Sequence, residues 1–87
     1  MTRVLIGVNV PTSATPGDDP VAYARLAEDL GFDYVSSSDH PSGTAPTFET
    51  WTMLTWLAAT TTRIGIATRV LGVPYRNVAM VAKMAEA

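Results

Sequence analysis

The sequence predicts an α/β fold in which parallel strands alternate with helices. Three segments have the apolar and β-branched composition of buried strands: Met1–Val10, Asp33–Ser37 and Ile64–Val70. A segment with helical periodicity follows each of them. Strand–helix units in this order build right-handed parallel sheets. No terminator follows the last helical segment, Val78–Glu86, so we expect the opening part of a larger barrel.

The segment after the first strand predicts a helix over Pro20–Leu30. Asp19 supplies a side-chain N-cap, and Pro20 suits the first helical position, where a missing N–H costs nothing. Gly31 fits the left-handed position that commonly ends a helix. The apolar stripe expected to face the core comprises Tyr23, Ala24, Leu26, Ala27 and Leu30.

Two more helices are predicted further along the chain. Thr47 is expected to cap a second helix that runs to about Ala59, and Thr60–Thr62 marks its exit. Asn77 is expected to cap a last helix from Val78 onward. The core face expected for the second helix comprises Trp51, Leu54 and Ala58, whereas Met53 and Trp56 form a second apolar side that faces either the core or a subunit partner.

Composition and charge narrow the classes of function. The chain has 87 residues, of which 47% are hydrophobic and 16% are charged, with a net charge of −2. Such a composition is globular and leaves room for one small domain. The six Lys and Arg residues are scattered, which argues against a nucleic-acid partner. No apolar run suits a membrane span or a signal peptide. The chain has no Cys and hence no disulfide, so the cytoplasm is the compartment we expect.

Catalytic groups of parallel sheets lie at the carboxyl ends of the strands, which here predicts Asn9–Ser13, Ser38–Pro41 and Arg69–Tyr75. Asp39 and His40 leave the second strand at this edge. Histidine can pass a proton, and a neighbouring carboxylate can bind a cofactor hydroxyl or orient a ring. In the alternative interpretation, Asp39 caps the following turn and His40 packs at the strand end.

Arg69 is a second candidate, because a charge at the mouth of a buried strand needs a partner. That partner is a ligand anion, Asp39, or another residue in a structural ion pair at the rim. The sequence patterns of phosphate-binding loops and of serine nucleophiles are absent. No glycine-rich turn follows the first strand, and Ser36–Ser38 lacks the glycines of a nucleophile elbow. The absence of Cys and the single His give poor support to a metal site.

Five motifs of the chain stand in register: Ala27–Asp33, Ser38–His40, Pro46–Glu49, Leu57–Gly65, and Val70–Asn77 followed by Ala82-Lys83. Together they resemble the luciferase-like monooxygenase superfamily. Their Ser-Asp-His sequence is more similar to the branch that uses the deazaflavin coenzyme F420 than to the bacterial luciferases proper.

The resemblance implies a TIM barrel, of which residues 1–87 would be the N-terminal (β/α)3 portion, truncated after about three strands. It implies F420 as cofactor, with FMN as the alternative, and a small organic substrate. The parent enzyme would transfer a hydride or activate oxygen, and the isolated chain is expected to be inactive. A non-catalytic module that self-associates through open sheet edges, or pairs with a complementary barrel fragment, is the alternative function.

The resemblance also implies roles for individual residues. His40 would be catalytic at the reactive face of the deazaflavin, and Asp39 would contact the coenzyme. The peptide between Arg69 and Val70 would be a non-prolyl cis bond that forms a bulge behind the ring. Gly72 would lie close to the coenzyme. Arg69 stands where the family often has a small residue, so it would either crowd the ring or bind a phosphate or substrate group.

Overall fold

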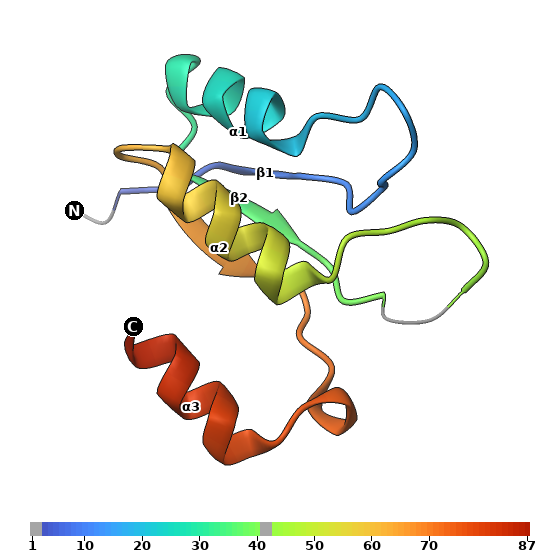
Figure 1. The fold of residues 1–87 in the computed structure, drawn as a ribbon. Coiled ribbons are helices and arrows are strands. Elements are labelled where there is room, and N and C mark those ends of the chain that lie inside the picture. Colours follow the sequence, from blue (N-terminus) through green and yellow to red (C-terminus); the bar gives the residue numbers. More distant parts are fainter. Residues whose placement is uncertain (1–2, 41–42) are drawn as a thin grey trace.

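The computed structural model describes residues 3–40 and 43–87 and contains a parallel sheet flanked by helices (Figure 1). Met1 and Thr2, from the predicted first strand, and Pro41, from the predicted second site segment, lie outside the described residues. The predicted α/β class with parallel βα units is confirmed. The elements are β1 (Gly7–Asn9), α1 (Pro20–Asp29), β2 (Tyr34–Ser37), α2 (Thr50–Thr60), β3 (Gly65–Thr68), the 3-10 turn η1 (Val73–Tyr75) and α3 (Val78–Glu86).

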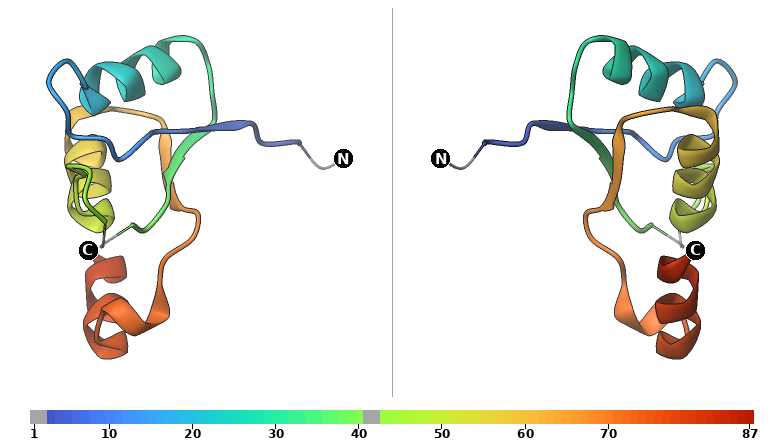
Figure 2. Two further views of the ribbon diagram at one scale, coloured as in Figure 1. Left: turned by 90° about the vertical axis from the view of Figure 1, so that its right-hand side faces the viewer. Right: turned by 90° about the vertical axis from the view of Figure 1, so that its left-hand side faces the viewer.

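The sheet has the order β1-β2-β3, with β2 parallel to both neighbours. Val35 at the centre of β2 is in register with Val8 on one side and Ile66 on the other. Figure 2 shows α1 and α2 on one side of the sheet, whereas no described helix covers the opposite face. In Figure 1, α3 lies apart from this layer, and none of its residues is buried. The core therefore lies between the sheet and the α1–α2 layer.

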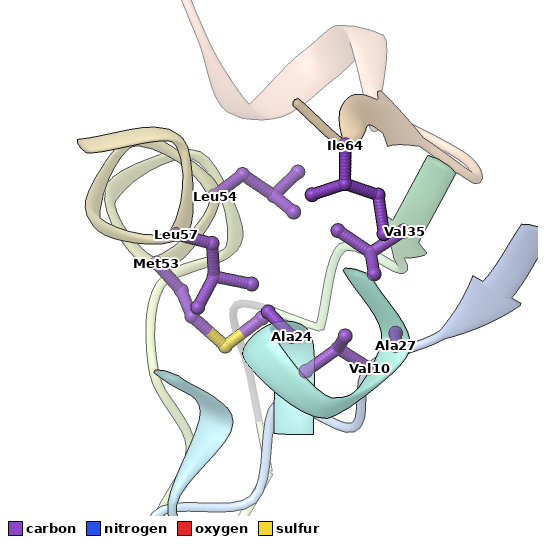
Figure 3. Packing of buried hydrophobic residues seen from close by; sticks show 8 residues of the cluster. All are labelled: Val10, Ala24, Ala27, Val35, Met53, Leu54, Leu57 and Ile64. Atoms are coloured by element: carbon purple, nitrogen blue, oxygen red, sulfur yellow. The ribbon is translucent and has the colours of Figure 1, made fainter. Parts of the chain in front are cut away.

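The buried core is apolar and compact (Figure 3). Val35 points from the sheet toward the helices and is fully buried. Alanines on α1 let this helix approach the sheet closely, and larger side chains from α2 fill the remaining space. The core comprises Val10, Ala24, Ala27, Val35, Met53, Leu54, Leu57 and Ile64.

The predicted core stripe of α1 is only partly correct. Ala24 and Ala27 are buried, but Tyr23, Leu26 and Leu30 are exposed. Helical periodicity alone is compatible with several buried stripes on α1. Contact with the sheet determines which stripe is buried, and here it is the one with small residues. The first strand is also shorter than predicted, because its pairing with β2 begins only at Gly7 and Tyr34.

The predicted core face and cap of α2 are corrected as well. The N-cap is Glu49, whose carboxylate accepts the backbone N–H groups of Trp51 and Thr52, while Thr47 instead bridges to Ser13. Ala58, predicted inside, is exposed. The buried residues of α2 are Thr50, Met53, Leu54 and Leu57.

The second apolar side predicted for α2 is split between the core and the surface. Met53 is buried in the core, so it cannot face a subunit partner. Trp56 remains 44% exposed and packs edge-on against Phe48, with ring centroids 5.9 Å apart. The remaining caps are confirmed. Asp19 accepts the N–H of Ala22 at 3.0 Å, and Asn77 accepts two N–H groups at the start of α3.

Glycine is required at two points that shape this part of the fold. Gly31 follows α1 with a φ of 90°, a left-handed conformation that confirms the predicted helix stop. Gly7 lies beneath the ring of Tyr34, and a Cβ at position 7 would overlap that ring. Among the described residues, no helix has the length and apolarity needed to cross a membrane.

Glu28, in the last turn of α1, holds the start of the third strand. Its carboxylate accepts the backbone N–H groups of Thr62, Arg63 and Ile64, at 3.0, 2.6 and 2.8 Å. The bonds from Arg63 and Ile64 are the main reason why the pKa of Glu28 falls to about 2. One side chain thus fixes the α2–β3 turn at the amino-terminal end of the sheet.

Replacing Glu28 by Gln is expected to lower the free energy of unfolding at neutral pH. The folded-state pKa of about 2 lies below the ordinary value of 4.5, so the carboxylate stabilises the fold fully above about pH 4.5. This contribution is lost as the pH falls toward 2. Urea unfolding should therefore show a stability gap between wild type and Glu28→Gln that closes in acid.

The matched control is Asp29→Asn, which removes the next carboxylate of the same helix. The Asp29 side chain makes no hydrogen bond to the other residues that the structure describes, so we expect no gap for this variant. A gap for Glu28→Gln that persists unchanged in acid would contradict the role assigned to its carboxylate.

Candidate active site

The carboxyl ends of the three strands meet at one edge of the sheet, as predicted. Main-chain hydrogen bonds continue beyond the regular strands: Val10 N–H donates to Ser36 O at 2.7 Å, and Arg69 N–H donates to Ser37 O at 2.8 Å. The buried hydroxyl of Ser37 donates to Val10 O at 2.8 Å. These bonds bring the segments that leave β1, β2 and β3 side by side.

His40 lines an open pocket of about 320 Å³ between the loops that follow β1 and β2. The two loops are joined by main-chain bonds from Ala14 N–H to Pro46 O and from Phe48 N–H to Thr12 O, at 3.0 and 2.8 Å. Hydroxyl groups dominate the polar part of the lining. The lining residues are Asn9, Val10, Pro11, Thr12, Ser13, Ser37, Ser38, His40, Ala45, Pro46 and Thr47.

Asp39 contacts the segment that follows β3. Its backbone N–H donates to Val70 O at 3.2 Å, and its Oδ2 accepts the N–H of Gly72 at 2.9 Å. The side chain is only 3% exposed. The structure thus joins three of the predicted site residues, Asp39, Val70 and Gly72, by direct hydrogen bonds.

Arg76 is the cation that pairs with the Asp39 carboxylate. One guanidinium nitrogen bonds Oδ2, and the other bonds Oδ1 at 3.1 Å, which makes the pair bidentate. The same guanidinium also pairs with Glu49, the N-cap of α2. The alternative in which Arg69 pairs with Asp39 is therefore wrong. The side chain of Arg69 is exposed and bonds no other residue that the structure describes.

The pKa values at this network follow its contacts. Hydrogen bonds from Arg76 lower the pKa of Asp39 below its usual range, although burial opposes the shift. The bond to Asp39 raises the pKa of Arg76. Partial burial acts to raise the pKa of Glu49, but bonds from Thr52, Arg76 and Trp51 outweigh it and lower the pKa. All three groups are held in their charged forms.

The backbone near the third strand end has two unusual features. The peptide between Arg69 and Val70 is cis, which confirms what the family resemblance implies. Gly72 lies against the ring of Tyr75, and a Cβ at position 72 would overlap that ring and come within 3.4 Å of Asp39 Oδ2. A side chain at this position would therefore displace the ring of Tyr75.

No pattern in the sequence indicates Arg76 as a site residue. It lies 37 positions from Asp39 and 27 from Glu49, so no local pattern connects the three. Arg76, Asp39 and Glu49 each lie near a strand or helix end at the same edge of the sheet. Their opposite charges at this shared edge are the one sequence feature that could have predicted the ion pairs.

The donor set of the site suits an organic ring system better than a metal ion. Within residues 3–40 and 43–87, no group of three or more His, Cys, Asp or Glu side chains is placed to hold a metal. Hydroxyls from Ser38 and Thr12, with the imidazole of His40, can bond the carbonyl and ring-nitrogen atoms of a polar aromatic group. The residues present therefore fit a flavin-like coenzyme in chemical type.

A comparison with known protein families finds a match. The family model described as luciferase-like monooxygenase matches residues 3–86, nearly the whole sequence. No curated protein matches the chain significantly.

Replacing Ser37 by Ala is expected to destabilise the fold by about 1–3 kcal/mol, because Val10 O then loses a buried hydrogen bond. Chemical denaturation would measure the change. Ser38→Ala is the control, since the structure shows no hydrogen bond from the Ser38 hydroxyl to a described residue. Equal stabilities of Ser37→Ala and Ser38→Ala would contradict the proposed link between the first two strand ends.

Proposed function

The chain belongs to the luciferase-like monooxygenase family, and we propose that it forms part of an oxidoreductase site that binds F420, or alternatively FMN. Family membership supports a general oxidoreductase or monooxygenase function. The proposal for this site rests on one observation. Asp39 is hydrogen-bonded to both Val70 and Gly72 at the edge of the sheet where His40 lines an open pocket.

Each of these residues has a separate part in the proposal. Such a coenzyme, when bound, supplies hydride transfer, or in the FMN case oxygen activation. His40 is the catalytic residue, whose exposed imidazole can donate or accept a proton at the ring or the substrate. Asp39, Val70 and Gly72 do not line the His40 pocket itself but lie at the same edge of the sheet, where they contact the coenzyme from the third strand end. Arg69, exposed at the third strand end, binds an anionic group of the coenzyme or of a small organic substrate.

We further propose that residues 1–87 form the first three βα units of a TIM barrel. Both β1 and β3 have an outer edge with no partner strand in the described sheet, and no described helix covers one sheet face. A closed barrel of this kind has roughly eight strands and a site built from loops after several of them. Further units would complete the site, so the 87-residue chain is expected to bind without turnover.

Titration of F420 and of FMN, followed by their fluorescence, tests the coenzyme proposal. We expect one of them to bind and the variants His40→Ala and Asp39→Ala to weaken binding by about tenfold or more, the value of one charge-assisted hydrogen bond. Asp29→Ala, at the far end of α1, should bind as wild type does. Failure of both coenzymes to bind, in this chain and in any longer natural form, would contradict the proposal.

A specific observation also favours the second candidate function, an assembly module. Large apolar side chains are exposed beside the free edge of β1: Leu26 and Leu30 of α1, with Tyr23, line an open apolar groove with Val8 and Phe32. Exposed sheet edges and apolar faces of this kind favour association. In this second proposal, two copies of the chain cover the groove and the edge with each other.

Sedimentation velocity over a range of concentrations tests the assembly candidate. We expect a discrete multimer that persists on dilution and is weakened by Leu26→Glu, because the charge would be buried in the groove. Ala59→Glu places the same charge on the exposed surface of α2 and serves as the control. A monomer at all concentrations, or open-ended aggregation, would contradict this candidate.

A further inference from the structure

We propose that Arg76 is a positioning residue that fixes the Asp39 carboxylate and, through it, the backbone of Val70–Gly72. Its relevance to coenzyme binding rests on the function proposed above. The positioning itself can be tested without a coenzyme.

The contacts of Arg76 join three separate loops. The residue itself lies in the loop that follows β3, Asp39 follows β2, and Glu49 begins α2. The guanidinium is 15% exposed, whereas Asp39 is 3% exposed and Glu49 is 47% exposed. The more deeply buried contact is the stronger one, because water screens the exposed carboxylate of Glu49. Arg76 therefore acts mainly on Asp39, with Glu49 as a lateral support.

The geometry of the pair depends on a guanidinium. Its planar fork places two N–H groups opposite the two carboxylate oxygens and fixes the rotation of the Asp39 side chain. In that rotation, Oδ2 also accepts the N–H of Gly72. A single ammonium group reproduces the charge but not this orientation.

Asp39 transmits this orientation to the third strand end. Its main-chain N–H holds Val70 O while its side chain holds the Gly72 N–H. Both contacts belong to the segment directly after the cis peptide. A rotated Asp39 side chain would therefore release the bond to Gly72, one of the two bonds by which Asp39 holds this segment.

Without Arg76, the Asp39 carboxylate would be buried beside a single N–H donor. Among the described residues, the charged or titratable groups that act on the Asp39 carboxylate are Arg76 and His40. Glu49 lies on the far side of Arg76. An unpaired buried charge is costly, so the carboxylate would take up a proton more readily or rotate toward solvent. Either response loosens its bond to Gly72.

The experiment compares Arg76→Met and Arg76→Lys with wild type and with Arg63→Met. Arg63 is a matched control, because its guanidinium bonds the backbone oxygens of Glu28 and Phe32 at the opposite end of the sheet. Two NMR readouts need no coenzyme: the titration of the carboxyl carbon of Asp39 and the amide shift of Gly72. The affinity for F420 and FMN is measured alongside.

For Arg76→Met we expect the Asp39 titration to move to higher pH and the Gly72 amide signal to shift. Coenzyme affinity should fall by about tenfold or more. Arg76→Lys should restore much of the Asp39 titration but leave the Gly72 signal displaced. Arg63→Met should change stability only.

Unchanged Asp39 and Gly72 signals in folded Arg76→Met would overturn the proposal. Where that variant does not fold, Arg76→Lys decides, since a wild-type Gly72 signal in it would also overturn the proposal. If wild type binds neither coenzyme, the proposed function fails, while the two NMR signals still decide whether Arg76 positions Asp39.

Discussion

Parallel pairing of β2 with both of its neighbours is the constraint on which the site depends. It aligns the carboxyl ends of three strands that are far apart in the sequence. Core packing maintains this alignment from one side, because Val35 of β2 contacts the layer formed by α1 and α2. The loops at the strand ends then add contacts of their own, such as the bond from Phe48 N–H to Thr12 O and the ion pair between Arg76 and Asp39.

Carboxylates secure the loops at both ends of the sheet, but in different environments. Glu28 accepts hydrogen bonds from three backbone N–H groups and the Thr62 hydroxyl and forms no ion pair with a described residue, which suffices near water. Asp39 is almost completely buried, and there a single N–H group does not balance the charge. Arg76 supplies the balance. This difference in burial explains why the carboxylate of Asp39 is paired with a guanidinium, whereas that of Glu28 is held by hydrogen bonds from uncharged donors.

Local features of this chain could be predicted from its sequence, whereas contacts between distant segments could not. The cap at Asp19 and the helix stop at Gly31 depend on neighbouring residues and were correct. The buried faces of α1 and α2 depend on what packs against them, and helical periodicity alone predicted these faces only in part. Glu49 and not Thr47 caps α2 because the helix begins only at Thr50, while Thr47 forms a bridge to Ser13.

The candidate site shows the same division. The rule for parallel sheets placed His40, Asp39 and Arg69 at the correct edge, because it depends only on strand direction. The bond between Asp39 and Arg76 depends on the spacing of two loops and on side-chain reach, which no periodicity encodes. The cis peptide before Val70 was predicted only through the family resemblance, since nothing in the residue types themselves demands it.

The close fit of Tyr75 over Gly72 has a consequence for substitutions at either position. The aromatic ring occupies the volume that a side chain at position 72 would need, so neither residue can be exchanged without regard to the other. A smaller residue at position 75 would relax the demand for glycine, and a larger residue at position 72 would expel the ring. The residues that position 72 tolerates therefore depend on the size of the side chain at position 75.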